Sequence, residues 1–160
     1  MKIVFITTGG TIDKIYFDRK NQFEVGDPRI TEVLREANVT LDHEVVPLMR
    51  KDSLDLTDTD RRLVLETVRK HPAHRFVVTH GTDTMIQTGK ILREALGKTV
   101  VLTGAMQPAR FRFTDAVFNI ATAVAAVQLL PQGVYIAMNG RIFAPERARK
   151  NVEMNRFEEI

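Results

Sequence analysis

The sequence predicts a three-layer α/β domain, in which a parallel sheet of about five strands lies between helices and a C-terminal β-hairpin follows. Short runs of apolar and β-branched residues alternate with longer stretches in which apolar residues have helical spacing. The connections are short and contain the glycine, proline, aspartate and threonine residues that start and stop such elements. This alternation favours parallel strands joined by right-handed crossovers.

The predicted strands are short. The first, Ile3-Val4-Phe5-Ile6, has no polar position, which is typical of a strand buried on both faces. Pro47 places the second at a sheet edge, because proline donates no ladder hydrogen bond. Asn139-Gly140 predicts a type I′ turn that returns the chain through residues 141–143. The five predicted strands are residues 3–6, 45–49, 75–79, 99–103 and 134–138.

Four helices are predicted between the strands. Asp27-Pro28 supplies an amino-terminal cap and a proline at the first helical position. Thr114-Asp115 is the expected cap of the last helix, and Gly97 the carboxyl cap of the third. The last helix is apolar almost all round, so we expect it to be covered on more than one side. The predicted helices are residues 27–37, 57–71, 85–95 and 114–130.

Two segments contribute less to this scheme. Residues 13–22 are polar and predict a loop or a hairpin, and the charged tail 145–160 is expected to add little to the core. Neither a repeat nor a linker interrupts the chain, so residues 1–160 are expected to form one domain.

Composition excludes several classes of function. The chain has 160 residues, 23 basic and 20 acidic, for a net charge of +3, which favours neither a nucleic-acid nor a membrane partner. With no cysteine, it has no disulfide, no thiolate metal ligand and no cysteine nucleophile. We see no signal peptide and no apolar run of membrane-spanning length, and therefore expect a cytoplasmic protein.

Three predicted strands end in turns rich in glycine and threonine, at residues 8–11, 79–84 and 103–106. The carboxyl ends of parallel strands share one edge of the sheet, where α/β domains bind ligands. Glycines expose backbone amides there, and a threonine hydroxyl can act as a nucleophile in acyl transfer. Phosphate binding is the alternative, although the chain has neither Gly-x-Gly-x-x-Gly nor a P-loop.

These turns resemble a known family. Thr8-Gly9-Gly10-Thr11-Ile12 and His80-Gly81-Thr82-Asp83-Thr84 are similar to the two signatures of the bacterial-type L-asparaginase family. Residues 52–57, 101–108 and 114–119 also resemble family segments, in the same order. The resemblance implies a Rossmann-like domain that hydrolyses L-asparagine to aspartate and ammonia without a metal or organic cofactor.

The resemblance also implies residue roles. Thr11 would be the nucleophile and Tyr16, on the mobile loop, its activating partner. Thr82, Asp83 and Lys150 would form a second catalytic cluster. Ser53 and Asp83 would hold the α-carboxylate and α-ammonium groups of the substrate. The remaining residues expected to line the pocket are Gly10, Gly81 and Ala105.

The chain departs from the family in several ways. Family members are about twice as long and have a second, smaller domain, so this chain resembles a short single-domain form. In long members, a neighbouring subunit helps to bind the substrate. Leu54 stands where some members have glutamine, and Phe23 stands where the loop tyrosine usually lies. Tyr135 is predicted to lie mid-strand, which leaves Tyr16 for the loop role.

Structural interpretations stand beside these roles. Thr11, Thr82 and Ser53 could serve only in turns, Asp83 as a helix cap, and Lys150 as a solvated charge. His80 is expected to be structural. Two rival functions are a glutaminase-type amidohydrolase that supplies ammonia to a partner and a non-catalytic amino-acid- or phosphate-binding module. The apolar fourth helix favours a homodimer or homotetramer.

Overall fold

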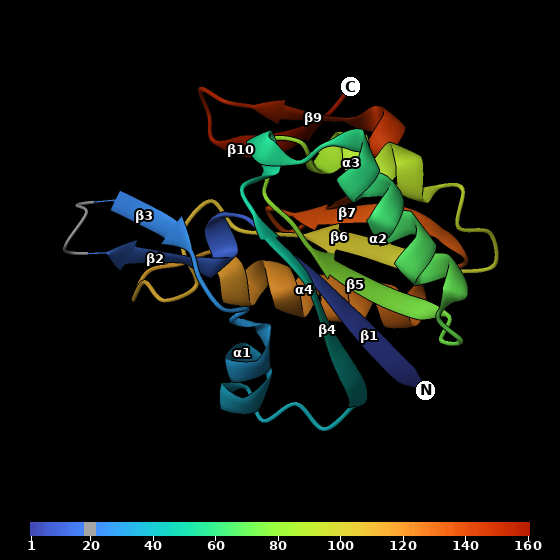
Figure 1. The fold of residues 1–160 in the computed structure, drawn as a ribbon. Coiled ribbons are helices and arrows are strands. Elements are labelled where there is room, and N and C mark those ends of the chain that lie inside the picture. The colour runs from blue at the N-terminus through green and yellow to red at the C-terminus, as the bar shows by residue number, and fades with distance from the viewer. Residues whose placement is uncertain (18–21) are drawn as a thin grey trace.

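The computed structural model describes residues 1–17 and 22–160 (Figure 1). Its main sheet has six strands in the order β4-β1-β5-β6-β7-β8. All neighbouring strands in this order are parallel except the last pair, in which β8 runs antiparallel to β7. The strands are β1 (Lys2–Gly9), β4 (Asp42–Lys51), β5 (Arg75–Thr79), β6 (Thr99–Thr103), β7 (Gly133–Met138) and β8 (Arg141–Phe143).

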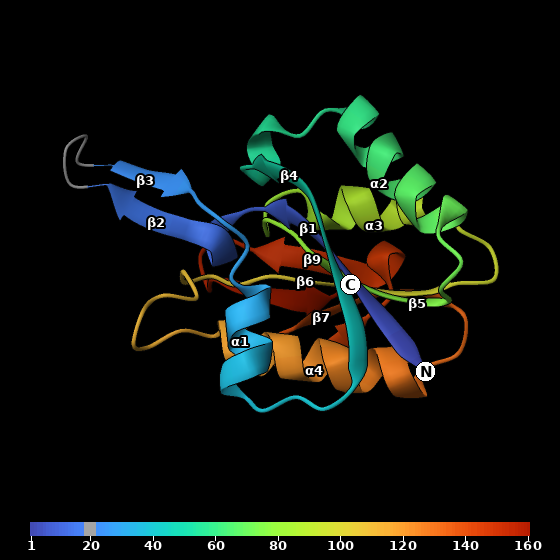
Figure 2. The same ribbon diagram turned by 60° about the horizontal axis from the view of Figure 1, so that its bottom comes forward.

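The predicted α/β architecture is confirmed. Helices α2 (Asp58–Lys70) and α3 (Met85–Leu92) cover one face of the sheet, and α1 (Ile30–Glu36) and α4 (Ala116–Leu129) cover the other (Figures 1 and 2). Successive residues of β1 pack alternately on the two faces of the sheet. Val4 and Ile6 pack in the core under α2 and α3, whereas Ile3 and Phe5 pack in the core under α1 and α4. This explains why β1 has no polar residue from Ile3 to Ile6.

Several local predictions are also confirmed. Strand β4, which contains Pro47, is an outer strand. Helix α2 starts at the predicted place, with Thr57 as its N-cap, and the structure adds a capping box between Thr57 and Asp60. Asn139 and Gly140 have φ values of 53° and 73°, as a type I′ turn requires. The segment after Thr11 contains a hairpin of β2 (Lys14–Phe17) and β3 (Gln22–Val25), and its turn lies outside the described residues.

Two helix boundaries differ from the prediction. Helix α1 begins at Ile30 rather than at Pro28, because the Arg29 amide donates to Asp13 and Asp27 pairs with Arg50. These contacts hold residues 27–29 outside the helix. Helix α3 ends at Leu92 instead of continuing to residue 95, and the chain then turns toward Gly97, whose φ is 76°.

The prediction that the tail adds little to the core is wrong. Strands β9 (Ala148–Asn151) and β10 (Arg156–Glu159) form an antiparallel hairpin. Phe157 and Ala148 are buried in the core that also contains α3, and the Phe157 ring lies 6.4 Å from that of Phe143. A single phenylalanine among charged residues was too weak a pattern to indicate this packing.

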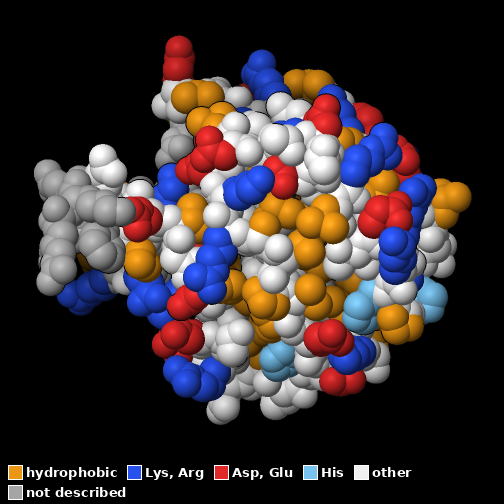
Figure 3. Space-filling model, viewed as in Figure 1, with side chains coloured by type: hydrophobic (Ala, Val, Ile, Leu, Met, Phe, Trp, Pro, Cys, Tyr) orange, Lys and Arg blue, Asp and Glu red, His pale blue; other side chains and the backbone are white. Residues whose placement is uncertain are grey.

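The prediction that α4 is covered on more than one side is not met within this chain. Its sheet side is buried, but Val117, Phe118 and Leu129 are 48%, 62% and 84% exposed. On the face that Figure 3 shows, acidic and basic side chains are intermixed, as the small net charge leads one to expect. No helix among the described residues is long and apolar enough to cross a membrane.

Candidate active site

The three glycine- and threonine-rich turns lie together at the carboxyl edge of the sheet. They follow β1, β5 and β6, which are neighbours in the strand order. The His80 amide donates to the Thr103 carbonyl at 2.9 Å, which joins the second turn to the third. The Gly10 amide donates to the Lys51 carbonyl at 3.0 Å, which joins the first turn to the end of β4.

Gly10, Gly81 and Ser53 meet where these turns converge. A Cβ on Gly10 would lie 2.5 Å from the Gly81 Cα, and Gly10 has a φ of 88°, which side-chain-bearing residues rarely adopt. A Cβ on Gly81 would lie 2.6 Å from both the Cβ and the Oγ of Ser53. Glycine is therefore required at both positions for the three segments to approach one another.

Thr11 begins a short 3-10 helix, Thr11–Asp13, directly after this contact. The Asp13 amide donates to the Gly10 carbonyl at 3.1 Å, and the Ala109 amide donates to the Ile12 carbonyl at 3.0 Å. Ile12 is buried, and Thr11 is half-buried. The backbone of this helix is thus fixed on both sides of Ile12, and Thr11 lies beside Gly10.

Lys150 of β9 reaches the turn after β5. Its Nζ donates to the Thr82 Oγ1 at 2.8 Å and to the Asp83 Oδ1 at 2.5 Å. Thr82 is 5% exposed, and the Lys150 side chain is 15% exposed. The structure thus brings Thr82, Asp83 and Lys150 together, and Lys150 is not a solvated charge. Asp83 does not cap α3, because its carboxylate faces Lys150 and the cap position is Thr84.

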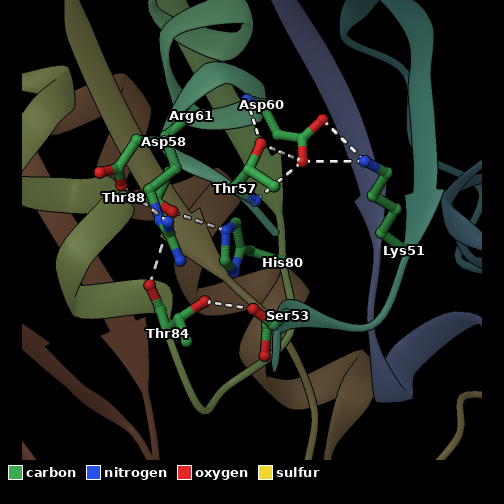
Figure 4. A network of polar contacts seen from close by, with 9 residues as sticks. All are labelled: Lys51, Ser53, Thr57, Asp58, Asp60, Arg61, His80, Thr84 and Thr88. Atoms are coloured by element: carbon green, nitrogen blue, oxygen red, sulfur yellow. Dashed lines mark hydrogen bonds and ion pairs between the residues drawn. The ribbon is translucent and has the colours of Figure 1, made fainter. Parts of the chain in front are cut away.

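Ser53 lies in a second 3-10 helix, Ser53–Asp55, and is 1% exposed. Its Oγ has no hydrogen-bond partner among the described residues. A buried hydroxyl without a partner costs about 1–3 kcal/mol, and a bound polar ligand would remove that cost. The Ser53 carbonyl accepts a hydrogen bond from the Thr84 Oγ1 at 2.7 Å, which ties this segment to the start of α3 (Figure 4).

His80 is buried among these segments (Figure 4), and its hydrogen-bond partners fix one tautomer of the ring. Its Nδ1 lies 2.7 Å from the Gly81 carbonyl oxygen, which can only accept, so Nδ1 carries the proton. The Nε2 then accepts from the Thr88 hydroxyl at 2.8 Å. Burial lowers the pKa of His80 to about 4, against the opposing effect of the Gly81 carbonyl, so the ring is neutral at pH 7. These contacts agree with a structural role.

Ala105 is buried in the third turn, which Asp115 supports. The Asp115 carboxylate accepts from the Met106 amide at 2.9 Å and from the Gln107 amide at 3.0 Å. The predicted cap of α4 was Thr114-Asp115. The Asp115 side chain does not cap the helix, whereas the Thr114 Oγ1 accepts from the Ala116 amide. Asn119, buried and one helical turn from Asp115, donates to both Asp115 and Gly104. Asn119, a polar residue on a largely apolar helix, was the sequence feature that could have indicated that α4 holds the third turn in place.

Tyr16 lies on the hairpin that extends away from the sheet (Figures 1 and 2). Tyr16 is 49% exposed, and its ring packs on Phe23 at a centroid distance of 5.4 Å. Phe23 in turn packs on Phe111 at 6.0 Å. The structure therefore groups Tyr16 with Phe23, the residue that stands at the usual place of the family's loop tyrosine.

Two surface hollows lie away from these turns. One of about 410 Å³ is lined mainly by residues 93, 95–98 and 132–135, at the amino edge of the sheet. Another of about 220 Å³ lies between α1 and α4 and is apolar. Neither is lined by a candidate site residue. Among the described residues, no group of three or more histidine, aspartate or glutamate side chains could hold a metal ion.

The fold is an α/β domain with a cluster of hydroxyl-bearing residues, a candidate ligand site, at the carboxyl edge of its parallel strands. A family model described as Asparaginase, N-terminal, matches residues 2–158, and the chain belongs to this family. The chain is 28% identical over 171 residues to the glutaminase-asparaginase of Acinetobacter glutaminasificans, a match that covers 96% of this chain and 50% of that one.

Two further comparisons agree. L-asparaginase 1 of Escherichia coli (strain K12) is 34% identical over 114 residues, which cover 68% of this chain and 33% of that protein. The structure of the thermostable L-asparaginase from Thermococcus kodakarensis superposes with a TM-score of 0.85 at 25% identity, covering 100% of this chain and 51% of that one. The chain thus spans about half the length of that structure.

Proposed function

We propose that this protein is an amidohydrolase that converts L-asparagine to L-aspartate and ammonia. The observation that carries the proposal is the hydrogen-bonded cluster of Thr82, Asp83 and Lys150. This cluster adjoins Gly81, which packs against Gly10, the residue before Thr11, and against Ser53. Family membership and the names of the relatives support the same chemistry.

In this proposal Thr11 is the nucleophile. Its Oγ1 attacks the side-chain amide carbon, the C–N bond breaks, and the leaving nitrogen departs as ammonia after it gains the hydroxyl proton. Water then hydrolyses the acyl ester, which releases aspartate and restores Thr11. Tyr16 is proposed to activate Thr11, which requires the hairpin to bring its hydroxyl to the site.

The second cluster would handle the proton and part of the substrate. Lys150 and Asp83 polarise the Thr82 hydroxyl through the two contacts of the lysine Nζ. The unpartnered Ser53 hydroxyl would bind the α-carboxylate, and the half-exposed Asp83 would bind the α-ammonium group. Gly10, Gly81 and Ala105 would line the pocket, since glycines permit close approach of a ligand to the backbone.

Hydrolysis of glutamine is the second candidate, because the Acinetobacter relative bears both activities in its name. Glutamine is one methylene longer, and one methylene changes transition-state binding by about 1–3 kcal/mol. A cytoplasmic location and independence from metals and cofactors stay predictions.

The test is ammonia release by the purified protein with each amide in turn. We expect turnover of asparagine, with a kcat/KM for glutamine at least ~10-fold lower. Faster turnover of glutamine would make the protein a glutaminase. Saturable binding of either amino acid without any ammonia would instead identify a binding module and contradict the proposal.

A further inference from the structure

Lys14 and Asp52 form an ion pair between the two turns that carry Thr11 and Ser53. Lys14 directly follows the 3-10 helix of Thr11, and Asp52 directly precedes Ser53. The Lys14 Nζ lies 2.7 Å from the Asp52 Oδ2, and the two side chains are only 26% and 29% exposed. At this burial a pair of charges is screened less by water and salt than a pair on the surface.

The Asp52 carboxylate contacts both turns, one through each of its oxygen atoms. Its Oδ1 accepts from the Leu54 amide at 3.3 Å and so orients the helix of Ser53, while its Oδ2 faces Lys14. Burial tends to raise the pKa of Asp52, but the contacts with Lys14 and the Leu54 amide outweigh this effect and lower it. The carboxylate is therefore charged at neutral pH, and the pair is ionic.

The ion pair adds a second attachment to a backbone contact. The Gly10 amide already donates to the Lys51 carbonyl at 3.0 Å, where β1 and β4 end. Other contacts hold each turn to its own neighbours, but the ion pair is a second direct contact between the two turns and so helps to fix their relative orientation. Any rotation would reach Gly81 and the adjoining Thr82, because Ser53 packs on Gly81 without room for a Cβ.

We propose that Lys14 and Asp52 are positioning residues that fix the nucleophile turn relative to the substrate-binding turn, without touching the substrate themselves. This inference rests on the proposed amide hydrolysis. A displacement of reacting groups by about 1 Å can cost roughly 100-fold in rate, so even a small separation of the turns has a kinetic effect.

The test compares variants that remove one charge with little change in shape. In Lys14→Met and Asp52→Asn we expect kcat/KM for asparagine to fall roughly 10- to 100-fold, with a higher KM because Ser53 is displaced. Lys14→Arg keeps the charge and should recover most of the loss. Because the two residues act as one unit, the double variant should be no worse than either single variant.

A matched control exists at the other end of the same two strands. Lys2 pairs with Glu44 at 2.6 Å, and this pair joins β1 to β4 near the amino edge of the sheet. We expect Lys2→Met to keep the kcat and KM of the wild type. If Lys14→Met and Asp52→Asn behaved like Lys2→Met, or if their losses multiplied in the double variant, the inference would be overturned.

Amide hydrogen exchange gives a readout that does not depend on turnover. We expect faster exchange at residues 11–13 and 53–55 in Lys14→Met and Asp52→Asn, but not in Lys2→Met. Unchanged exchange would overturn the inference. If the wild type itself released no ammonia, the proposed function would fail, and hydrogen exchange would then decide by itself whether the pair holds the turns.

Discussion

At the scale of single residues, Asp13 is an unusual carboxyl group because it is buried beside the proposed nucleophile turn. It is 2% exposed, its Oδ1 accepts from the Arg29 amide at 2.9 Å, and its Oδ2 has no partner among the described residues. Burial raises the pKa of Asp13 to about 6, although the Arg29 amide and three arginines oppose this shift. In the folded protein Asp13 is therefore mostly protonated up to about pH 6.

This shift predicts how stability depends on pH. A carboxyl whose pKa is higher in the folded than in the unfolded state loses its favourable contribution as pH rises from the unfolded to the folded value, and the loss is complete above the folded value. The contribution is therefore favourable below pH 3.8 and is lost as pH passes about 6. Asp13→Asn should gain stability relative to the wild type between pH 4 and pH 8, by about 2–3 kcal/mol. Urea unfolding at pH 4 and pH 8 measures this gain. If the free energy of unfolding of Asp13→Asn differed from that of the wild type by the same amount at both pH values, the prediction would be contradicted. The exposed Asp42→Asn is the control.

The contacts of Lys150 predict that it acts as a unit with Thr82. Both Thr82→Val and Lys150→Met interrupt the same hydrogen bond of 2.8 Å. We expect each to lower kcat for asparagine by at least ~100-fold, and the double variant to be no worse than the poorer single variant. Near-normal turnover in both single variants would rule out this role.

At the scale of elements, the C-terminal hairpin positions Lys150 through the burial of Phe157. Phe157 is 2% exposed and lies in register with Lys150 across β9 and β10. Phe157→Ala should cost about 3 kcal/mol of stability and should also lower activity, because the strand that carries Lys150 loses its anchor. Thermal unfolding and ammonia release measure the two effects. Val152→Ala, at a hairpin position that is 74% exposed, should alter neither.

The elements that the sequence predicted well are those with local patterns. The apolar run of β1, the start of α2 at Thr57 and the Asn139-Gly140 turn are each determined within a few residues. The resemblance to a family also placed Lys150 with Thr82 and Asp83, which no local pattern indicates. Helix boundaries, and side-chain contacts that hold a turn in place, were not predicted where they depend on residues distant in the sequence. Asp27 is engaged by Arg50, and Asp115 by the amides of the preceding turn, so neither caps a helix through its side chain.

At the scale of the whole molecule, the exposed face of α4 is the feature that favours self-association. It carries Val117, Phe118 and Leu129, and the helix contains no charged residue. An apolar face of this kind commonly marks an interface. We propose a homodimer or homotetramer, and Phe118→Asp should shift it toward monomer in light scattering. Leu96→Asp, 87% exposed at the amino edge, is the control. A wild type that is monomeric at all concentrations would contradict the proposal.

The most direct test of the proposed mechanism is ammonia release from L-asparagine by Thr11→Ala. We expect a loss of at least ~1,000-fold in kcat, because no other hydroxyl takes the place of a removed nucleophile. Thr40→Ala, at an exposed position in the connection between α1 and β4, should retain wild-type turnover. If Thr11→Ala released ammonia as fast as the wild type, Thr11 would not be the nucleophile, and the proposed mechanism would be wrong.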